Sequence, residues 1–303
     1  MSELGDAIRA NALAVQRLSE PDLRAILPVL RRARDETAAG LVEFLQQRDG
    51  GDTYTVHTHR ALLAQLEPAI RTIEHELAPA ARRDVTRDAQ QASGWAVKHL
   101  RAVAEAGEKH FAMATPPLRF DSALVIRDAN HVLHTRFASS AARYAGAAGA
   151  RMRDTLAVSL IRGETIDQMT RRLLAGGDVR LRTLQRRGSE AVAEGVAERQ
   201  FFRNYADAER LARTELVNAY GEIQVQGLEA ANREDPGWLK RWDAANDRKV
   251  CPWCWSLNNV TVAPEEPFPE GVDHPPLHPC CRCAVVPWRV EWPAWEQFFK
   301  RAA

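Results

Sequence analysis

The sequence predicts a mostly α-helical protein that carries a small α+β module at its C-terminal end, held by one structural zinc ion. Two observations predict this class. Before residue 232, apolar residues recur at helical spacing over long stretches and show little of the alternation typical of strands. All five cysteines then fall within residues 251–283, in a segment rich in proline. With 303 residues, the chain is long enough to bury a sizeable core.

Three parts are expected along the chain. Residues 1–112 are predicted to form an N-terminal helical region, residues 113–232 a helical body, and residues 233–303 the Cys/His zinc module. The first boundary rests on the segment Met113–Pro117, which reads as a linker. The formal net charge of +1 creates no overall field that would attract nucleic acid or a membrane. No membrane span and no signal peptide are expected, because no long apolar run is present.

The first part is expected to hold three helices. Two lie within residues 3–48, and the second of them starts at Ser19-Glu20-Pro21-Asp22, where a cap precedes proline and acids occupy the first turn. The third helix is predicted from an apolar stripe at helical spacing, and Pro68 inside it predicts a kink or a break. The stripe consists of Leu62, Leu66, Ile70, Ile73 and Leu77.

The helical body is predicted to contain a helix from about Phe120 to Ile161 and a second helix capped by Thr165 with Gln168. That second helix should end at Gly176-Gly177. A strongly amphipathic helix is then expected over Asp207–Ala230, with a buried stripe along one side.

A basic cluster follows the glycine pair. It is interpreted either as a solvated helix face or as a contact for packaged DNA or an acidic partner, since phosphate contacts need little more than clustered cations. Its members are Arg180, Arg182, Arg186 and Arg187.

The last part is expected to contain two strands, Trp238–Trp242 and Ala284–Val290, with an extended proline-rich loop between them. Six of the eight tryptophans fall between Trp242 and Trp295. So many aromatic side chains in a small module indicate a compact core or a docking surface.

Three roles compete for the cysteines. Disulfides are disfavoured because the number of cysteines is odd, and buried apolar cysteines are disfavoured because the segment is rich in proline and charge. A metal site fits best, since two thiolates in a Cys-x-x-Cys turn followed by a second Cys/His cluster can hold a tetrahedral Zn²⁺. The candidate ligands are Cys251, Cys254 and Cys281, with either His278 or Cys283 as the fourth. Cys280 is left out, because adjacent cysteines cannot comfortably both face one ion.

A closed structural site is expected rather than a catalytic one. A zinc deaminase requires His-x-Glu before the Cys-x-x-Cys, and no histidine in the chain is followed two positions later by Glu. An HNH-like metal nuclease is the alternative, with Asp273 and His274 as its metal-and-base pair. That class needs a later His and Asn, and neither residue type occurs after Cys283.

The Cys/His segment resembles the phage Mu F-like head morphogenesis family, the minor head proteins of tailed phages. The likeness covers roughly residues 160–290, and its most specific part is a run in which Cys280 occupies a variable position. The matching motifs are Gly163-Glu164-Thr165-Ile166, Ala212-Arg213-Thr214-Glu215, Trp242, Asp247-Arg248, Cys251-x-x-Cys254 and Pro275-Pro276-x-His278-Pro279-x-Cys281-Arg282-Cys283.

The resemblance implies a structural protein and not an enzyme. Members join the portal or the inner capsid during head assembly, so portal and capsid proteins are the expected partners. The expected location is the virion, and the host cytoplasm while heads assemble. Contact with packaged DNA would be weak and indifferent to sequence.

Overall fold

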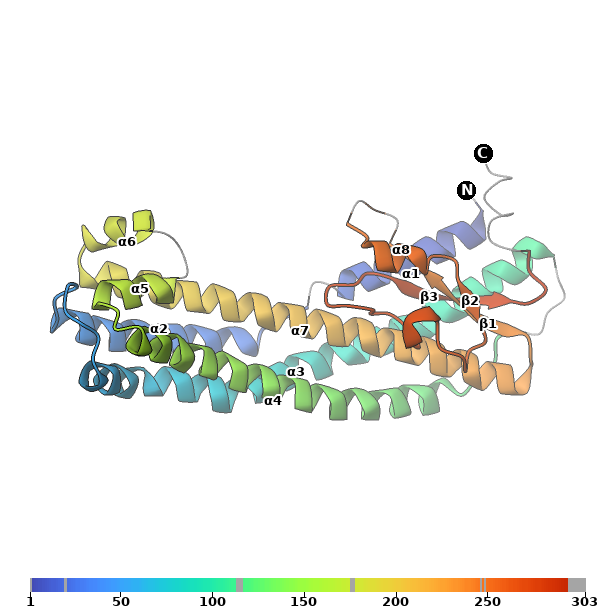
Figure 1. Cartoon of the computed structure of the whole chain (residues 1–303). Coiled ribbons are helices and arrows are strands. Elements are labelled where there is room, and N and C mark those ends of the chain that lie inside the picture. Colours follow the sequence, from blue (N-terminus) through green and yellow to red (C-terminus); the bar gives the residue numbers. More distant parts are fainter. Residues whose placement is uncertain are drawn as a thin grey trace. The chain divides into compact units, whose positions relative to one another are not determined.

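The computed structural model describes residues 2–18, 21–112, 117–174, 178–245, 247 and 249–293 (Figure 1). It is mostly helical with a small C-terminal strand region, as the sequence predicts. The helices are α1 (Glu3–Leu18), α2 (Ile26–Gln46), α3 (Val56–Phe111), α4 (Ser122–Ile161), α5 (Ile166–Leu174), α6 (Asp178–Gln185), α7 (Ser189–Glu234) and α8 (Pro252–Ser256). The strands are β1 (Trp238–Asp243), β2 (Thr261–Val262) and β3 (Ala284–Arg289), and a 3₁₀ turn spans Pro269–Gly271.

The chain divides into two compact units, each assembled from separate segments. The first unit consists of Met1–Asp22, Val85–Arg136 and Arg210–Ala303. The second consists of Leu23–Asp84 and Phe137–Glu209. The long helices α3, α4 and α7 each contribute residues to both units. For this reason the units do not coincide with the division at residues 112 and 232 expected from the sequence.

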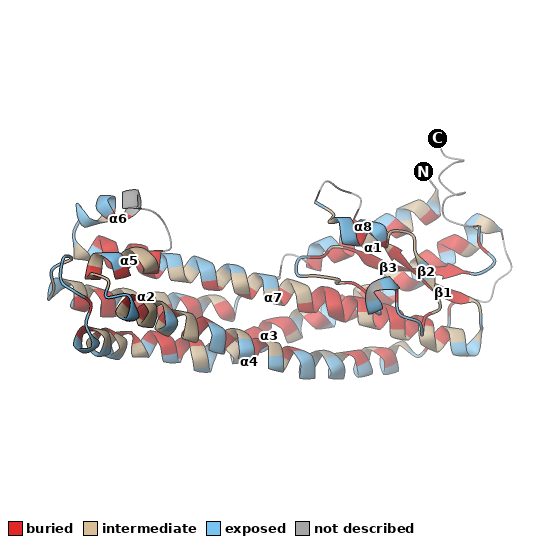
Figure 2. Ribbon diagram, viewed as in Figure 1, coloured by how far each residue is buried: buried red, intermediate tan, exposed pale blue. Residues whose placement is uncertain are grey.

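The second unit is built on the apolar faces of its helices, which appear as the buried strips in Figure 2. All five residues of the stripe that begins at Leu62 are buried. Pro68 does not break the helix, so the expectation of a break is wrong. Pro68 and Pro79 both lie on the exposed face of α3. Proline has no N–H, so a carbonyl of the preceding turn lacks its helical donor. On the exposed face water can donate to that carbonyl, while packing of the buried face keeps the helix continuous.

Helix ends in the second unit are capped in two ways. Thr165 Oγ1 accepts from Gln168 N at 3.3 Å and Gln168 Oε1 accepts from Thr165 N at 2.8 Å, which confirms the predicted capping box. The cap of α2 comes instead from α3, where Asp84 accepts bonds from the backbone N–H groups of Ala25 and Ile26 at 3.0 Å. Helix α2 therefore starts at Ile26.

Several predicted helix ends need correction or lie outside the described residues. Ser19 and Glu20 of the expected start signal, most of the segment Met113–Pro117, and Gly176-Gly177 all lie outside them. Helix α7 begins at Ser189, well before Asp207, because its apolar pattern is already set by Ala193, Val196 and Ala197.

The first unit contains an antiparallel sheet in the order β2-β1-β3. Both predicted strands form, and they pair with each other so that Trp238 faces Arg289 and Trp242 faces Val285. Strand β2 was not predicted, because two residues give no periodic signal. The expected buried stripe of α7 is confirmed, with Leu216, Tyr220 and Ile223 all buried.

A buried polar network ties α1, α7 and the sheet together. Asn11 of α1 donates to the Val285 carbonyl of β3 at 2.8 Å. Its amide oxygen accepts from Tyr220 Oη at 2.5 Å and from Gln224 Nε2 at 2.9 Å. These bonds satisfy the polar groups of the buried Asn11 and hold α7 next to the strand that follows the cysteine loop.

Candidate metal centre

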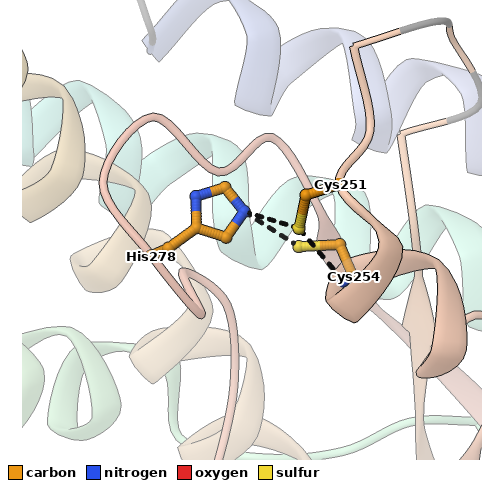
Figure 3. A group of neighbouring side chains, drawn as sticks. All are labelled: Cys251, Cys254 and His278. Carbon is orange, nitrogen blue, oxygen red and sulfur yellow. Dashed lines mark hydrogen bonds between the residues drawn. The ribbon is translucent and has the colours of Figure 1, made fainter.

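The first pair of candidate ligands is positioned by the short helix α8. Cys251 is its N-cap residue and Pro252 occupies its first position, where proline is well tolerated. The Cys254 backbone N–H donates to Cys251 Sγ at 3.3 Å. This turn brings Cys251 and Cys254 to one side of the loop, where His278 meets them (Figure 3).

The second set of candidate ligands comes from the loop that leads into β3. His278 Nε2 lies 3.1 Å from Cys251 Sγ and 3.2 Å from Cys254 Sγ. Cys254 Sγ lies 3.7 Å from Cys281 Sγ. Two overlapping groups result, one of Cys251, Cys254 and His278, the other of Cys254, Cys281 and Cys283, and in each group the donor atoms lie within 4.8 Å of one another. All five residues singled out from the sequence are thus brought together.

This geometry fits a tetrahedral metal ion. With metal–sulfur distances of about 2.3 Å, the sulfur–sulfur edge of a tetrahedron is about 3.8 Å, close to the separation of Cys254 and Cys281. His278 Nδ1 lies 2.8 Å from the Pro279 carbonyl, so the proton is held there and Nε2 is left as the ligand atom. Cys254, Cys281 and Cys283 are buried, whereas Cys251 and His278 are half-buried.

The electrostatics of the cluster favour one thiolate in particular. The bond from the Cys254 thiol lowers the pKa of Cys281, and the same bond raises the pKa of Cys254. Burial lowers the pKa of His278, but the Pro279 carbonyl and the sulfurs of Cys281 and Cys251 outweigh burial, so the pKa is raised. A bound cation would favour the deprotonated form of every one of these donors.

Cys280 lies apart from both groups. Its side chain is exposed, and its backbone takes a φ of 64°. The left-handed backbone conformation of Cys280 turns the chain between two loop segments, so that the next side chain, Cys281, faces the interior. The structure thus separates the two adjacent cysteines.

The residues of the alternative catalytic pair have different surroundings. Asp273 is exposed, whereas His274 is buried. His274 Nε2 lies 2.9 Å from Glu222 Oε2 of α7, and Nδ1 lies 2.6 Å from the Pro275 carbonyl. The bond from His274 lowers the pKa of Glu222. Both ring nitrogens of His274 therefore face oxygen acceptors.

Sequence reasoning missed Glu222, which makes this contact, and Gly221, which allows it. A Cβ atom on Gly221 would lie 2.7 Å from the Pro275 carbonyl oxygen and 2.8 Å from His274 Nδ1. Only a glycine permits so close an approach of α7 to the loop. The one sequence signal at this position is an isolated glycine inside a helical pattern, which indicates that another segment packs closely against the helix there.

The basic cluster is partly described. Arg182, Arg186 and Arg187 are exposed, at the end of α6 and just after it. The side chain of Arg180 lies outside the described part of the chain.

Residues 150–286 match the family model described as Phage Mu protein F like protein. The chain contains a phage Mu F-like region. The match includes all five candidate ligands and confirms the resemblance drawn from the motifs. The match to this region suggests a phage head-related protein.

Two further comparisons give no match, since neither a curated protein nor a solved structure is similar to the chain. Among the described helices, none is both long enough and apolar enough to cross a bilayer.

Proposed function

We propose that the protein is a structural minor head protein of a tailed phage or prophage, whose C-terminal module is held by one zinc ion. The observation that carries this proposal is a compact Cys/His cluster inside a phage Mu F-like region. Related minor components would join the portal or the inner capsid, so the chain would be found in the virion, and in the host cytoplasm during assembly.

In this proposal the zinc ion is structural. Cys251, Cys254 and Cys281 would bind it, with His278 or Cys283 as the fourth ligand. Because five protein donors surround a centre that needs four, side chains alone can complete the coordination shell. The module has a three-stranded sheet with a two-residue edge strand, so its apolar burial alone supplies little stability. Zinc binding of order 10 kcal/mol would decide whether it folds.

The surroundings of His274 favour a structural role over a nuclease. A general base needs a free nitrogen within reach of the water that it activates. His274 is 9% exposed, and both of its nitrogens contact acceptors, Glu222 and the Pro275 carbonyl. In this arrangement the ring joins the cysteine loop to α7. We therefore propose that the protein is not an enzyme.

Contact with packaged DNA is a minor part of the proposal. Arg182, Arg186 and Arg187 are exposed and clustered, which suits phosphate groups of any sequence. Binding through so few cations would be weak and would fall steeply with added salt.

One pair of assays tests the proposed function. The protein is co-expressed with the portal protein encoded beside it and purified by a tag on the portal. It is also incubated with plasmid DNA and Mg²⁺, Mn²⁺ or Zn²⁺. We expect co-purification and intact plasmid. Cleavage that His274→Ala abolishes, together with failure to associate with the portal, would overturn the structural role in favour of the nuclease.

A further inference from the structure

A groove lies between α2 and the first turns of α7, within the second unit. It consists of two adjoining hollows of about 460 Å³ and about 600 Å³, which share Ala38 and Glu194. Small residues form its floor, namely Ala38 and Ala39 from α2 and Ala191 and Gly195 from α7. Two larger side chains, Val42 and Leu184, complete the apolar part of the lining, and Leu184 lies against Gly195.

The α7 side of the groove carries a ladder of negative charge. Glu190, Glu194 and Glu198 are spaced four residues apart and therefore lie on one face of the helix. Glu43 of α2 adds a fourth carboxylate to the lining.

Two arginines also line the groove, but they offset little of this charge. Arg34 is hydrogen bonded to its neighbour Asp35 at 2.6 and 2.8 Å, which leaves Arg187 as the remaining cation of the lining. The groove therefore has a clear excess of negative charge over an apolar floor.

The ladder differs from several other acidic residues of this unit. Glu74 pairs with Arg153, Glu164 with Arg172, and Asp207 with Arg151. Glu43, Glu190, Glu194 and Glu198 make no hydrogen bond or ion pair among the described residues. Like charges four residues apart repel each other along a helix, whereas Glu190, in the first turn of α7, also lies where a negative charge is favourable.

We propose that this groove binds a basic amphipathic helix from a partner protein. Small apolar residues of that helix would lie on the alanine floor, and its Lys or Arg side chains, spaced three or four apart, would pair with the glutamate ladder. Nucleic acid does not fit, because the lining carboxylates would repel phosphate groups. The proposal does not depend on zinc or on a role in the phage head.

The probe is a fluorescent 18-residue peptide with Ala and Leu on one helical face and Lys at every fourth position on the other. Fluorescence anisotropy measures its affinity for the full chain. In the variant Glu190→Gln/Glu194→Gln/Glu198→Gln, we expect binding at least tenfold weaker, while far-ultraviolet circular dichroism shows the same helical signal as the unaltered protein. A control variant, Asp128→Asn/Glu234→Gln/Glu266→Gln, removes the same charge at exposed positions outside the groove and should bind normally.

A second variant tests the floor without changing any charge. Ala38→Trp fills the shared wall of the two hollows and should abolish binding of the peptide while the chain stays folded. Equal affinity of the peptide for the unaltered protein and for the ladder variant would overturn the proposal. Self-association of the unaltered chain in sedimentation, lost in the ladder variant, would assign the groove to a second copy and also overturn it.

Discussion

His274 Nε2 and Glu222 Oε2 lie 2.9 Å apart although 52 positions separate the two residues in the chain. The pair joins the loop that carries His278 and Cys281 to the C-terminal half of α7. The loop that carries the cysteine cluster is therefore anchored to α7, outside its own segment.

We expect the purified protein to contain one zinc ion per chain and no disulfide. The free energy of zinc binding by four protein ligands is larger than the free energy that the module gains by folding without metal. Elemental analysis of protein purified without chelator measures the metal content, and thiol titration under denaturing conditions counts free cysteines. Substantially less than one zinc per chain would contradict the proposed centre.

Cys281→Ser should weaken zinc binding and destabilise the module from about Trp238 onward, because it removes the buried thiol whose pKa the cluster lowers. Far-ultraviolet circular dichroism should retain most of its helical signal, while the tryptophan fluorescence changes. Cys280→Ser, the adjacent exposed cysteine, is the control and should keep its zinc. A similar loss of stability in both variants would show that the assigned ligands are wrong.

Glu222→Gln should destabilise the protein by about 1 kcal/mol near neutral pH, since the amide still offers an acceptor to His274 but lacks the charge that strengthens the bond. The pKa of Glu222 is lowered in the folded state by the bond from His274. Its contribution is therefore fully present above the ordinary glutamate pKa of about 4.3, and is lost as pH falls through the lowered value.

Urea unfolding of Glu222→Gln and the unaltered protein, measured in parallel from pH 7 downward, tests this dependence. The difference in unfolding free energy should stay constant near neutral pH and shrink below about pH 4.3. A difference that grows at acid pH would contradict the role given to this carboxylate.

Gly221→Ala should destabilise the protein by about 1–3 kcal/mol, because the new methyl group would collide with the Pro275 carbonyl and the His274 ring. Gly94→Ala is a matched control within the same unit, since a Cβ atom there meets nothing within 4 Å. That substitution should stabilise by about 0.5–1 kcal/mol through helix propensity alone. Thermal unfolding should show a lower melting temperature for Gly221→Ala and a higher one for Gly94→Ala than for the unaltered protein.

Features set by local sequence could be predicted, whereas those set by distant partners could not. The apolar stripe from Leu62, the Thr165 capping box and the strands around Trp238 and Val285 follow from spacing and composition within a few residues. The cap of α2 could not be predicted, because its acceptor, Asp84, lies on another helix.

The candidate site shows the same contrast. Clustering of sulfur and imidazole along the chain was enough to single out the residues that the structure brings together, from Cys251 to Cys283. The contact of Glu222 with His274 has no local signal, since a glutamate beside a buried helical stripe is ordinarily solvated. The closeness of α7 to the loop depends on Gly221, whose role appears only with its neighbours in place.

The network around Asn11 has a consequence for the order in which the chain can fold on the ribosome. Asn11 is synthesised before Tyr220, Gln224 and Val285, to which it bonds and which follow it by 209, 213 and 274 positions. All segments of the second unit, which ends at Glu209, are synthesised before these three. Helix α1 therefore lacks these partners until Val285 has been translated, so a chaperone that shields α1 in this interval would raise the yield of folded protein.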